Sequence, residues 1–499
     1  MADGFADYSP SAMAAQRQSL QKYQAKLAAI DIKGWPVSEV IDYNLVRAEM
    51  DGLEFDHRVL HPWFRDPAFY TAVIESESDV PLHEGPYAYG TLELWQHPLP
   101  LSPSDVTLVR AKLAAIPPML AQAKKNLTES HKDLWTLAIH SKGEESRALA
   151  DFSRKVAATH PDLATATDRA RAAVDDFHGW LKIKVKAMKT SPAIGIDNYN
   201  WYLKRVHFVP YNWAELLAIE QRELQRSLAS LALERQHNRN LPELALPASA
   251  EELKSRNNAA LDTFLAFMKE QQLFTVRDYM NQNRLRDRPG QLQPASALDV
   301  FSQVEYRDST PMKTHAIHWL EKQRLDHEPH PSPIRSSRLL YNIWDGRSEG
   351  FATAWEEIVM NAGLYDGRPR TRELVYFLVA LRCIRGIADL KMHSGEFTLD
   401  QAIQYVVATT PNGWFKPHSQ TLWNDLQIYA HQPGYGTTYI TGKVAFDHLL
   451  ADQSSQIGPS LRFGNFMDQF FASGIIPMSL IRWEMTGKDD EIAQLDMRR

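Results

Sequence analysis

Two histidines three residues apart and an acidic segment further along the chain carry the clearest chemistry in the sequence. His315 and His318 stand in the segment THAIHW, and Glu349 follows in RSEGFA. Residues i and i+3 share one face of an α-helix, so a helix here would direct both imidazoles at one ion. Glu349 would supply an oxygen ligand from a second helix. The sequence therefore predicts a divalent-metal site formed by His315, His318 and Glu349.

A metal-activated water also needs a base, and the spacing of the glutamates suggests one. The chain has no His-Glu-x-x-His signature, in which the glutamate beside the first histidine is the base. Glu356 lies about two helical turns after Glu349 and so shares its face. We predict Glu356 as the base. Two alternatives remain open at this point: the histidines could be ordinary structural residues, and the glutamates a solvated acidic turn.

Two arginines and a histidine on a later segment could contact a substrate. Arg382 and Arg385 share a helical face and could bind a carboxylate through two parallel hydrogen bonds, or could instead bridge neighbouring helices. Asp389 and His393 are one turn apart. They could act as an orienting pair in which His393 carries a proton, or form a plain hydrogen-bonded helix pair.

A glycine-rich segment supplies further candidates. Tyr435 and Tyr439 lie beside Gly434 and Gly436, and their phenols could donate hydrogen bonds to a developing oxyanion. The alternative is a tight turn with packed tyrosines. Lys443 could bind an anionic group or be a solvated lysine.

These segments resemble a known family. The stretch 347–356, RSEGFATAWE, is similar to the Glu-Gly-Trp-Ala-Leu-Tyr-Ala-Glu segment of the domain of unknown function 885 family, large helical proteins likened to zinc metallopeptidases. Arg385, Asp389 and His393 fall where that family has Arg, Asp and His, and 433–443 resembles its Pro-Gly, Tyr and Gly stretch. The resemblance covers the larger, C-terminal part of the chain. It implies a mainly α, zincin-like fold with at most a small β-sheet, and zinc as the ion.

The chain departs from that family at one motif. The family carries His-Glu-x-x-Pro-Gly-His before its Glu-Gly segment, whereas this chain reads TPMKTHAIH over 310–318. The His-Glu pair is therefore missing, and the family's usual base cannot be assigned to a residue here. His315 or His318 would match the last histidine of the motif.

Composition limits the class of protein. The chain has 499 residues, 23% of them charged, and a formal net charge of -6, so nothing indicates binding to nucleic acid or to an anionic membrane. The single cysteine, Cys383, excludes an intrachain disulfide framework and fits a reducing cytoplasm. No apolar run approaches the ~18 residues of a membrane span. We expect a cytoplasmic protein; its oligomeric state is left open.

Apolar periodicity predicts helices along most of the chain. The predicted helical stretches are 11–30, 38–60, three helices within 104–188 with an interruption at Pro117–Pro118, 212–235 and 251–268. Residues 61–103 are expected to form a long connection, and only 274–276 and 297–301 suggest strand. We expect an N-terminal helical region, 1–190, and a C-terminal region, 191–499, that carries the site, within one continuous body.

The function predicted from these residues is a metal-dependent hydrolase of a small peptide-like or ester substrate. His315, His318 and Glu349 would bind the ion, Glu356 would be the base, and His393 and Tyr439 would also be catalytic. Substrate contacts are expected from four residues, which are Arg382, Arg385, Tyr435 and Lys443. The missing His-Glu pair keeps two alternatives open: a metal-dependent lyase or tailoring enzyme acting on a small molecule, and a non-catalytic descendant that binds a ligand.

Overall fold

The computed structural model describes residues 4–77, 87–189, 191–280, 285–286, 292–336, 345–495 and 497. Over these residues the protein is mainly α-helical, as the sequence predicts, and its strands form one two-stranded parallel sheet. None of the helices in these ranges combines the length and the apolar composition needed to cross a membrane.

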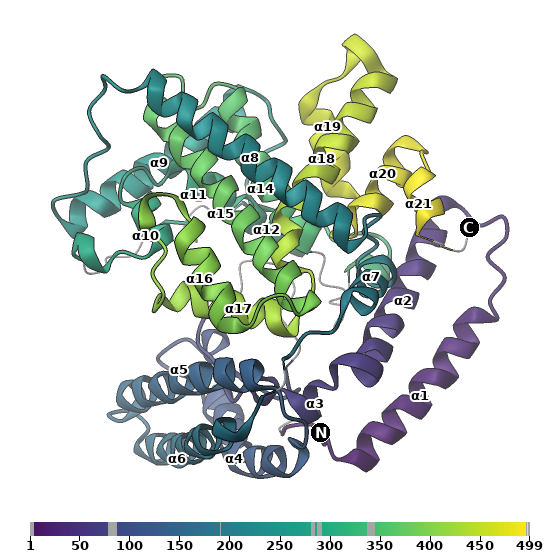
Figure 1. The fold of residues 1–499 in the computed structure, drawn as a ribbon, viewed down its shortest axis with the longest axis vertical. Coiled ribbons are helices and arrows are strands. Elements are labelled where there is room, and N and C mark those ends of the chain that lie inside the picture. Colours follow the sequence, from purple (N-terminus) through teal and green to yellow (C-terminus); the bar gives the residue numbers. More distant parts are fainter. Residues whose placement is uncertain are drawn as a thin grey trace.

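The N-terminal helices follow the predicted pattern closely. The N-terminal elements are α1 (Pro10–Ala28), α2 (Val37–Phe55), α3 (Pro62–Arg65), α4 (Pro103–Asn126), α5 (Lys132–Val156) and α6 (Pro161–Lys184). A capping box starts α4, in which Ser102 and Asp105 each bond the other's backbone N–H. In Figure 1, α4, α5 and α6 lie side by side as a three-helix group at one end of the molecule.

The predicted interruption at Pro117–Pro118 is wrong, because α4 continues through both prolines. A proline removes one backbone hydrogen bond and crowds the preceding turn. Here Ile116, Met119 and Leu120 are buried on both sides of the prolines. Tertiary packing of this apolar face thus holds the helix together across the lost hydrogen bonds.

The sheet does not lie where strands were predicted. Its strands are β1 (Val73–Ile74) and β2 (Leu92–Glu93), paired Val73 with Leu92 and Ile74 with Glu93. Residues 274–276 are irregular, and 297–301 end a 3₁₀ turn and begin a helix. Asp299 explains the second error, because its side chain accepts a hydrogen bond from the backbone N–H of Ser302 and caps that helix.

The C-terminal region is built around long helices that carry most of the predicted site. Its elements are α7 (Ile196–Arg205), α8 (Trp213–His237), α9 (Ala250–Glu270), α10 (Val300–Glu305), α11 (Thr310–His315), α12 (Ile317–His327), α13 (Pro333–Ser336), α14 (Asp345–Asn361), α15 (Pro369–Ser394), α16 (Leu399–Thr409), α17 (Gln420–His431), α18 (Tyr435–Ile457), α19 (Phe463–Ala472), α20 (Met478–Thr486) and α21 (Asp490–Gln494). Helix α15 packs against α8 and α18, and α18 packs against α14 (Figure 1). A single hydrophobic cluster joins buried residues of α4–α6 to buried residues of α15–α18.

Glycines allow α14 and α18 to approach until their backbones touch. A Cβ added at Gly442 would lie 1.9 Å from the carbonyl oxygen of Gly346, and one added at Gly350 would lie 2.3 Å from the Cα of Gly442. Contacts this short do not occur between real atoms, so only glycine fits this crossing. The crossing sets the distance between Glu349 on one helix and Tyr439 on the other.

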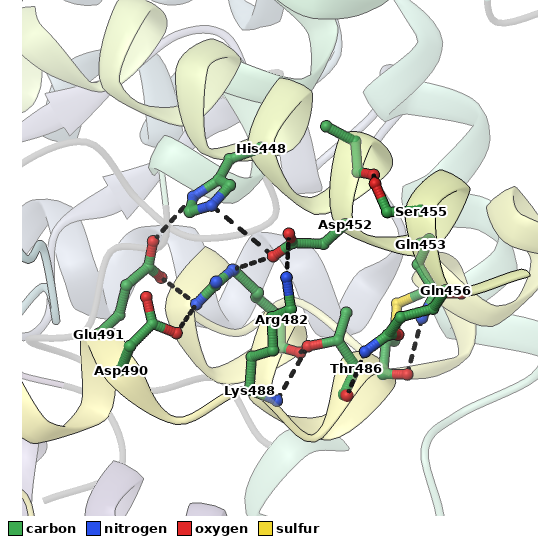
Figure 2. A network of polar contacts seen from close by, with 12 residues as sticks. His448, Asp452, Gln453, Ser455, Gln456, Arg482, Thr486, Lys488, Asp490 and Glu491 are labelled. Atoms are coloured by element: carbon green, nitrogen blue, oxygen red, sulfur yellow. Dashed lines mark hydrogen bonds and ion pairs between the residues drawn. The ribbon is translucent and has the colours of Figure 1, made fainter. Parts of the chain in front are cut away.

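Ion pairs hold the last helices together. Arg482 on α20 donates to Asp452 on α18 at 2.8 Å and to Asp490 on α21 at 2.7 Å. His448 lies between Glu491, at 3.2 Å from its Nδ1, and Asp452, at 3.6 Å from its Nε2 (Figure 2). The network therefore ties α20 and α21 to the far part of α18.

A buried glutamate lies between α8 and α15. Glu220 is fully buried, and neither of its carboxylate oxygens has a hydrogen-bond partner among the described residues. Its carboxyl group contacts the backbone of α15 at Gly386, where an added Cβ would lie 2.6 Å from Oε1. Burial raises the pKa of Glu220 well above its usual value of 4.5, and the nearby Asp389 and Glu223 raise it further. The burial of this carboxyl group therefore favours its protonated form in the folded protein.

Replacement of Gly442 tests the helix crossing. Gly442→Ala should lower the free energy of unfolding by about 1–3 kcal/mol or more, because the methyl group must push α14 and α18 apart. Gly179→Ala is the matched control: Gly179 lies within α6 with open space around it, so alanine should be neutral or slightly stabilising. Urea unfolding measures both. An unchanged midpoint for Gly442→Ala would contradict the close approach.

The raised pKa of Glu220 predicts how stability depends on pH. Between pH 4.5 and its raised pKa the unfolded chain has lost this proton and the folded chain retains it, so ionisation favours unfolding and stability falls as pH rises. Glu220→Gln should remove this contribution, so its advantage over wild type in urea unfolding should grow from pH 5 to pH 8. The exposed Glu270→Gln is the control. A pH-independent difference would show that Glu220 is ionised in the folded state.

Candidate metal centre

The two histidines lie on different helices. His315 is the last residue of α11 and His318 is in the first turn of α12, with a break at Ala316, where φ is −65° and ψ is 11°. The single continuous helix predicted here is therefore wrong. Trp319 N–H bonds the carbonyl of Ala316, an i to i+3 bond that tightens the chain at the break. The two imidazole rings still lie 5.2 Å apart and nearly perpendicular, at 86°.

Glu349 completes a group of three ligand-type side chains. Its Oε2 lies 3.0 Å from Nε2 of His315, and one ligand atom from each of His315, His318 and Glu349 lies within 4.8 Å of the others. Glu349 and His318 are buried, and His315 is nearly so. These three residues could hold a metal ion.

Glu356 and Arg382 hold His315 from its other side. Oε1 of Glu356 lies 2.9 Å from Nδ1 of His315. Arg382 donates to both oxygens of Glu356, at 2.7 and 2.9 Å, and its Nη2 also lies 3.1 Å from Nδ1. Glu356 and Arg382 are buried, and the side chain of His315 is only 11% exposed. The imidazole of His315 is thus fixed between two carboxylates, one of which is locked to an arginine.

The surrounding charges shift the pKa values of these groups. Burial and the charge of Arg382 oppose protonation of His315, but its hydrogen bonds to Glu349 and Glu356 outweigh them and raise its pKa. Burial alone would raise the pKa of Glu349, yet its hydrogen bond to His315 and the positive charges of His315, His318 and Arg382 lower it to about 2. The pKa of Glu356 is lowered against burial chiefly by Arg382. Both carboxylates are therefore ionised at neutral pH.

The donor set fits a divalent ion of the zinc type. Zinc takes histidine nitrogens and carboxylate oxygens at about 2.0–2.2 Å in tetrahedral geometry, which places neighbouring ligand atoms roughly 3.3 Å apart. The 3.0 Å between His315 and Glu349 is close to that spacing, so an ion could replace the shared proton after a small movement. Nδ1–H of His315 could then still donate to Glu356, the usual arrangement of a metal-bound histidine.

Arg385 and Tyr439 lie beside this group. Arg385 donates to Asp425 on α17 at 2.9 Å, and its guanidinium lies 4.8 Å from the centre of the Tyr439 ring. Arg382 lies 5.8 Å from the same ring. Burial and the charge of Glu349 raise the pKa of Tyr439 well above 10, so its phenol keeps its proton and can donate a hydrogen bond.

Three other predicted residues contact different parts of the protein. Nε2 of His393 bonds the carbonyl of Tyr429 at 2.7 Å and so carries the proton, and burial lowers its pKa to about 4. Tyr435 packs against the rings of Tyr429 and Tyr439. Lys443 forms ion pairs with Glu357 and Asp447.

Asp389, beside His393, holds the start of α18. Its Oδ2 accepts the backbone N–H of Gly436 at 2.7 Å, and its Oδ1 lies 3.7 Å from His393. Burial raises the pKa of Asp389 to about 8, against the hydrogen bonds from Gly436, Gly434 and Tyr199.

Two ion pairs near the site were not predicted from the sequence. Asp425 pairs with Arg385, and Glu321 on α12 pairs through both oxygens with the buried Arg347 on α14. Arg347 also lies 3.7 Å above the ring of Phe470. Asp425 could have been found by its position, because Leu422 and Tyr429 share its helical face and are both buried. A carboxylate on an apolar face requires a partner.

Solved structures that share this fold include two proteins described as lipoproteins. One is described as a "putative lipoprotein of unknown function" from Shewanella oneidensis; it has a TM-score of 0.69 and 16% identity, and the match covers 97% of this chain and 94% of that one. The other, a "putative lipoprotein" from Colwellia psychrerythraea, has a TM-score of 0.66 and 15% identity, with 98% and 92% covered. At this identity the likeness shows the fold alone. The curated proteins contain no match.

A family comparison covers nearly the whole chain. The profile described as "Bacterial protein of unknown function (DUF885)" matches residues 2–297 and 318–485. The unmatched stretch between them, 298–317, contains His315 and the residues that stand where the His-Glu motif was expected. On the strength of this match, the chain belongs to the DUF885 family of bacterial proteins of unknown function.

Proposed function

We propose that the protein is a metal-dependent hydrolase of a small peptide-like or ester substrate. The observation that supports this most is the buried group of His315, His318 and Glu349, two imidazoles and one carboxylate whose ligand atoms converge within 4.8 Å. A donor set of two histidines and one glutamate is typical of catalytic zinc, and leaves a fourth position for water or substrate. When bound, such an ion would supply a polarised water or carbonyl.

The residues around this group have distinct roles in the proposal. Glu356 orients His315, because it holds Nδ1 while the other ring nitrogen faces Glu349. This role fits its contacts better than that of a base, since Arg382 already occupies both of its oxygens. Tyr439 would donate a hydrogen bond to the reacting oxygen, and Arg385 would bind a substrate carboxylate in exchange for Asp425.

A second function is favoured by the same contacts. Both carboxylates beside His315 are engaged, Glu349 with Nε2 and Glu356 with Arg382, so neither is free to take a proton from water. A metal-dependent lyase or tailoring reaction on a small molecule needs no such water. The non-catalytic, ligand-binding alternative predicts no turnover of any kind.

The cellular location of the protein can also be tested. The single cysteine led to the prediction of a cytoplasmic protein. The two proteins of similar fold are described as lipoproteins, which makes the cell envelope the alternative. Fractionation of cells that produce the full-length gene product decides between them.

Metal analysis tests the proposed centre. Protein purified without added metal should contain about one equivalent of zinc or another divalent ion per chain, measured by plasma mass spectrometry. His318→Ala should lose it. His448→Ala, which alters a histidine of the C-terminal network, is the control and should retain it. If wild type and His318→Ala both lack stoichiometric metal after reconstitution, the centre does not exist. If a metal-loaded sample turns over no member of a peptide and ester library, the hydrolase is replaced by the lyase.

The orienting role of Glu356 makes a separate prediction. Glu356→Gln should weaken metal binding about 10–100-fold without abolishing it, whereas Glu349→Gln should abolish it. Because the first variant leaves Arg382 buried beside a neutral amide, Glu356→Gln/Arg382→Gln is measured as well, and circular dichroism verifies that both fold. Competition with a chelator gives the affinities. Equal losses in Glu356→Gln and Glu349→Gln would mean that Glu356 is itself a ligand.

A further inference from the structure

A pocket rich in arginine opens between α8, the start of α15 and the 411–414 turn. Its volume is about 430 Å³, the size of a small-molecule site. Four arginines and two glutamates line it, so positive side chains outnumber negative ones by two. The lining arginines are Arg235, Arg239, Arg307 and Arg370. None of the residues predicted from the sequence as part of the metal centre lines this pocket.

Three of these arginines are held by neutral oxygens. Arg235 donates to the side-chain oxygen of Asn412 at 2.6 Å, and Arg239 to the carbonyl of Gln236 at 2.9 Å. Arg307 donates to the carbonyl and side-chain oxygens of Gln303. These contacts position the guanidinium groups but do not neutralise them.

The carboxylates in the pocket do not balance this charge. Glu373 accepts hydrogen bonds from Asn238 at 2.9 Å and from Arg370 at 3.2 Å. Glu243 pairs with Arg370 at 3.1 Å, but its side chain is 87% exposed. An exposed ion pair of this kind contributes little to stability, so a bound anion could readily displace Glu243 from Arg370. The pocket therefore has a net positive charge, which an added anion would balance.

Apolar side chains form the other wall. Leu231, Leu374 and Phe377 are buried at the pocket, and the Trp414 ring packs edge-on against Phe377 with 4.7 Å between centres. The guanidinium of Arg307 lies 4.5 Å from the centre of the Trp414 ring. A ligand bound here would meet charged donors on one side and an aromatic surface on the other.

We propose that this pocket binds a small organic dianion in which two negative charges stand beside an aromatic or apolar group. Arg235 and Arg239 bind the anionic group, because arginine matches phosphate and carboxylate oxygens through paired N–H donors. Trp414 and Leu374 contact the apolar part. The site is separate from the metal centre and does not depend on the proposed hydrolase.

Calorimetric titration with phenyl phosphate tests the proposal. Binding should occur at 50 mM salt and weaken at 200 mM, because the anion is held by partly exposed charges. Arg235→Gln/Arg239→Gln should weaken it about tenfold or more, since each charged hydrogen bond lost removes part of the affinity. Both arginines are exposed, so the variant should fold. Arg154→Gln, at an exposed arginine on α5, is the matched control and should bind like wild type.

Three further measurements distinguish a two-part ligand site from unspecific anion binding and from binding at the metal centre. Inorganic phosphate and benzyl alcohol should each bind more weakly than phenyl phosphate, because each lacks one half of the ligand. Trp414→Leu should weaken phenyl phosphate and leave phosphate unchanged. His318→Ala should leave both unchanged. The proposal is overturned if no anion binds, if the double arginine variant binds like wild type, if phosphate alone binds as well as phenyl phosphate, or if binding is lost in His318→Ala.

Discussion

Charged side chains buried between α11, α14 and α15 are stabilised chiefly by one another, and this constraint governs the centre of the molecule. His315 lies between Glu349 and Glu356, and Arg382 pairs with Glu356 through both of its oxygens. Removal of a charge from water costs several kcal/mol, which only a close and well-oriented partner offsets. Each of these groups therefore requires the others in place. Two further contacts hold the helices of the site in place. These are the glycine crossing of α14 and α18 and the ion pair between Arg347 and Glu321.

The family match covers one part of this centre and leaves out another. The profile match stops before His315 and resumes at His318, while the glutamate segment on α14 is matched throughout. The two glutamates and His318 thus lie in the matched part of the chain, whereas His315 lies in the unmatched stretch, at the end of α11 where it meets α12 at Ala316. An ion held by His315, His318 and Glu349 would have its ligands from both parts. Its proton acceptor, however, would have to differ from the glutamate of the expected motif.

Much of the fold could be predicted from local pattern, because apolar periodicity reports which face of a helix is buried. The helices of 11–30, 212–235 and 251–268 were found in this way with small errors at their ends. The incorrect predictions of secondary structure have one cause. The persistence of α4 through Pro117, the capping of α10 by Asp299 and the break at Ala316 each depend on contacts that periodicity does not contain.

The candidate site was predictable to a similar degree. His315, His318 and Glu349 were found from residue type and helical spacing, and the structure brings their ligand atoms together. The pairing of Arg382 with Glu356 and of Arg385 with Asp425 was not predicted. Spacing along one helix shows which residues share a face, but not which residue of another helix meets them. Lys443 and His393 illustrate the same limit, because Lys443 pairs with Glu357 and Asp447, and His393 bonds the carbonyl of Tyr429, which the spacing along α18 and α15 did not indicate.

Helix α15 has a mechanical consequence that neither of its two sites reveals alone. Its first turns carry Arg370 and Phe377 in the arginine-rich pocket, and its middle carries Arg382 at the metal centre. Because its contacts with α8 and α18 hold α15 in place, the helix keeps the pocket and the metal centre at a fixed separation. Each site can therefore be occupied without displacing the residues of the other.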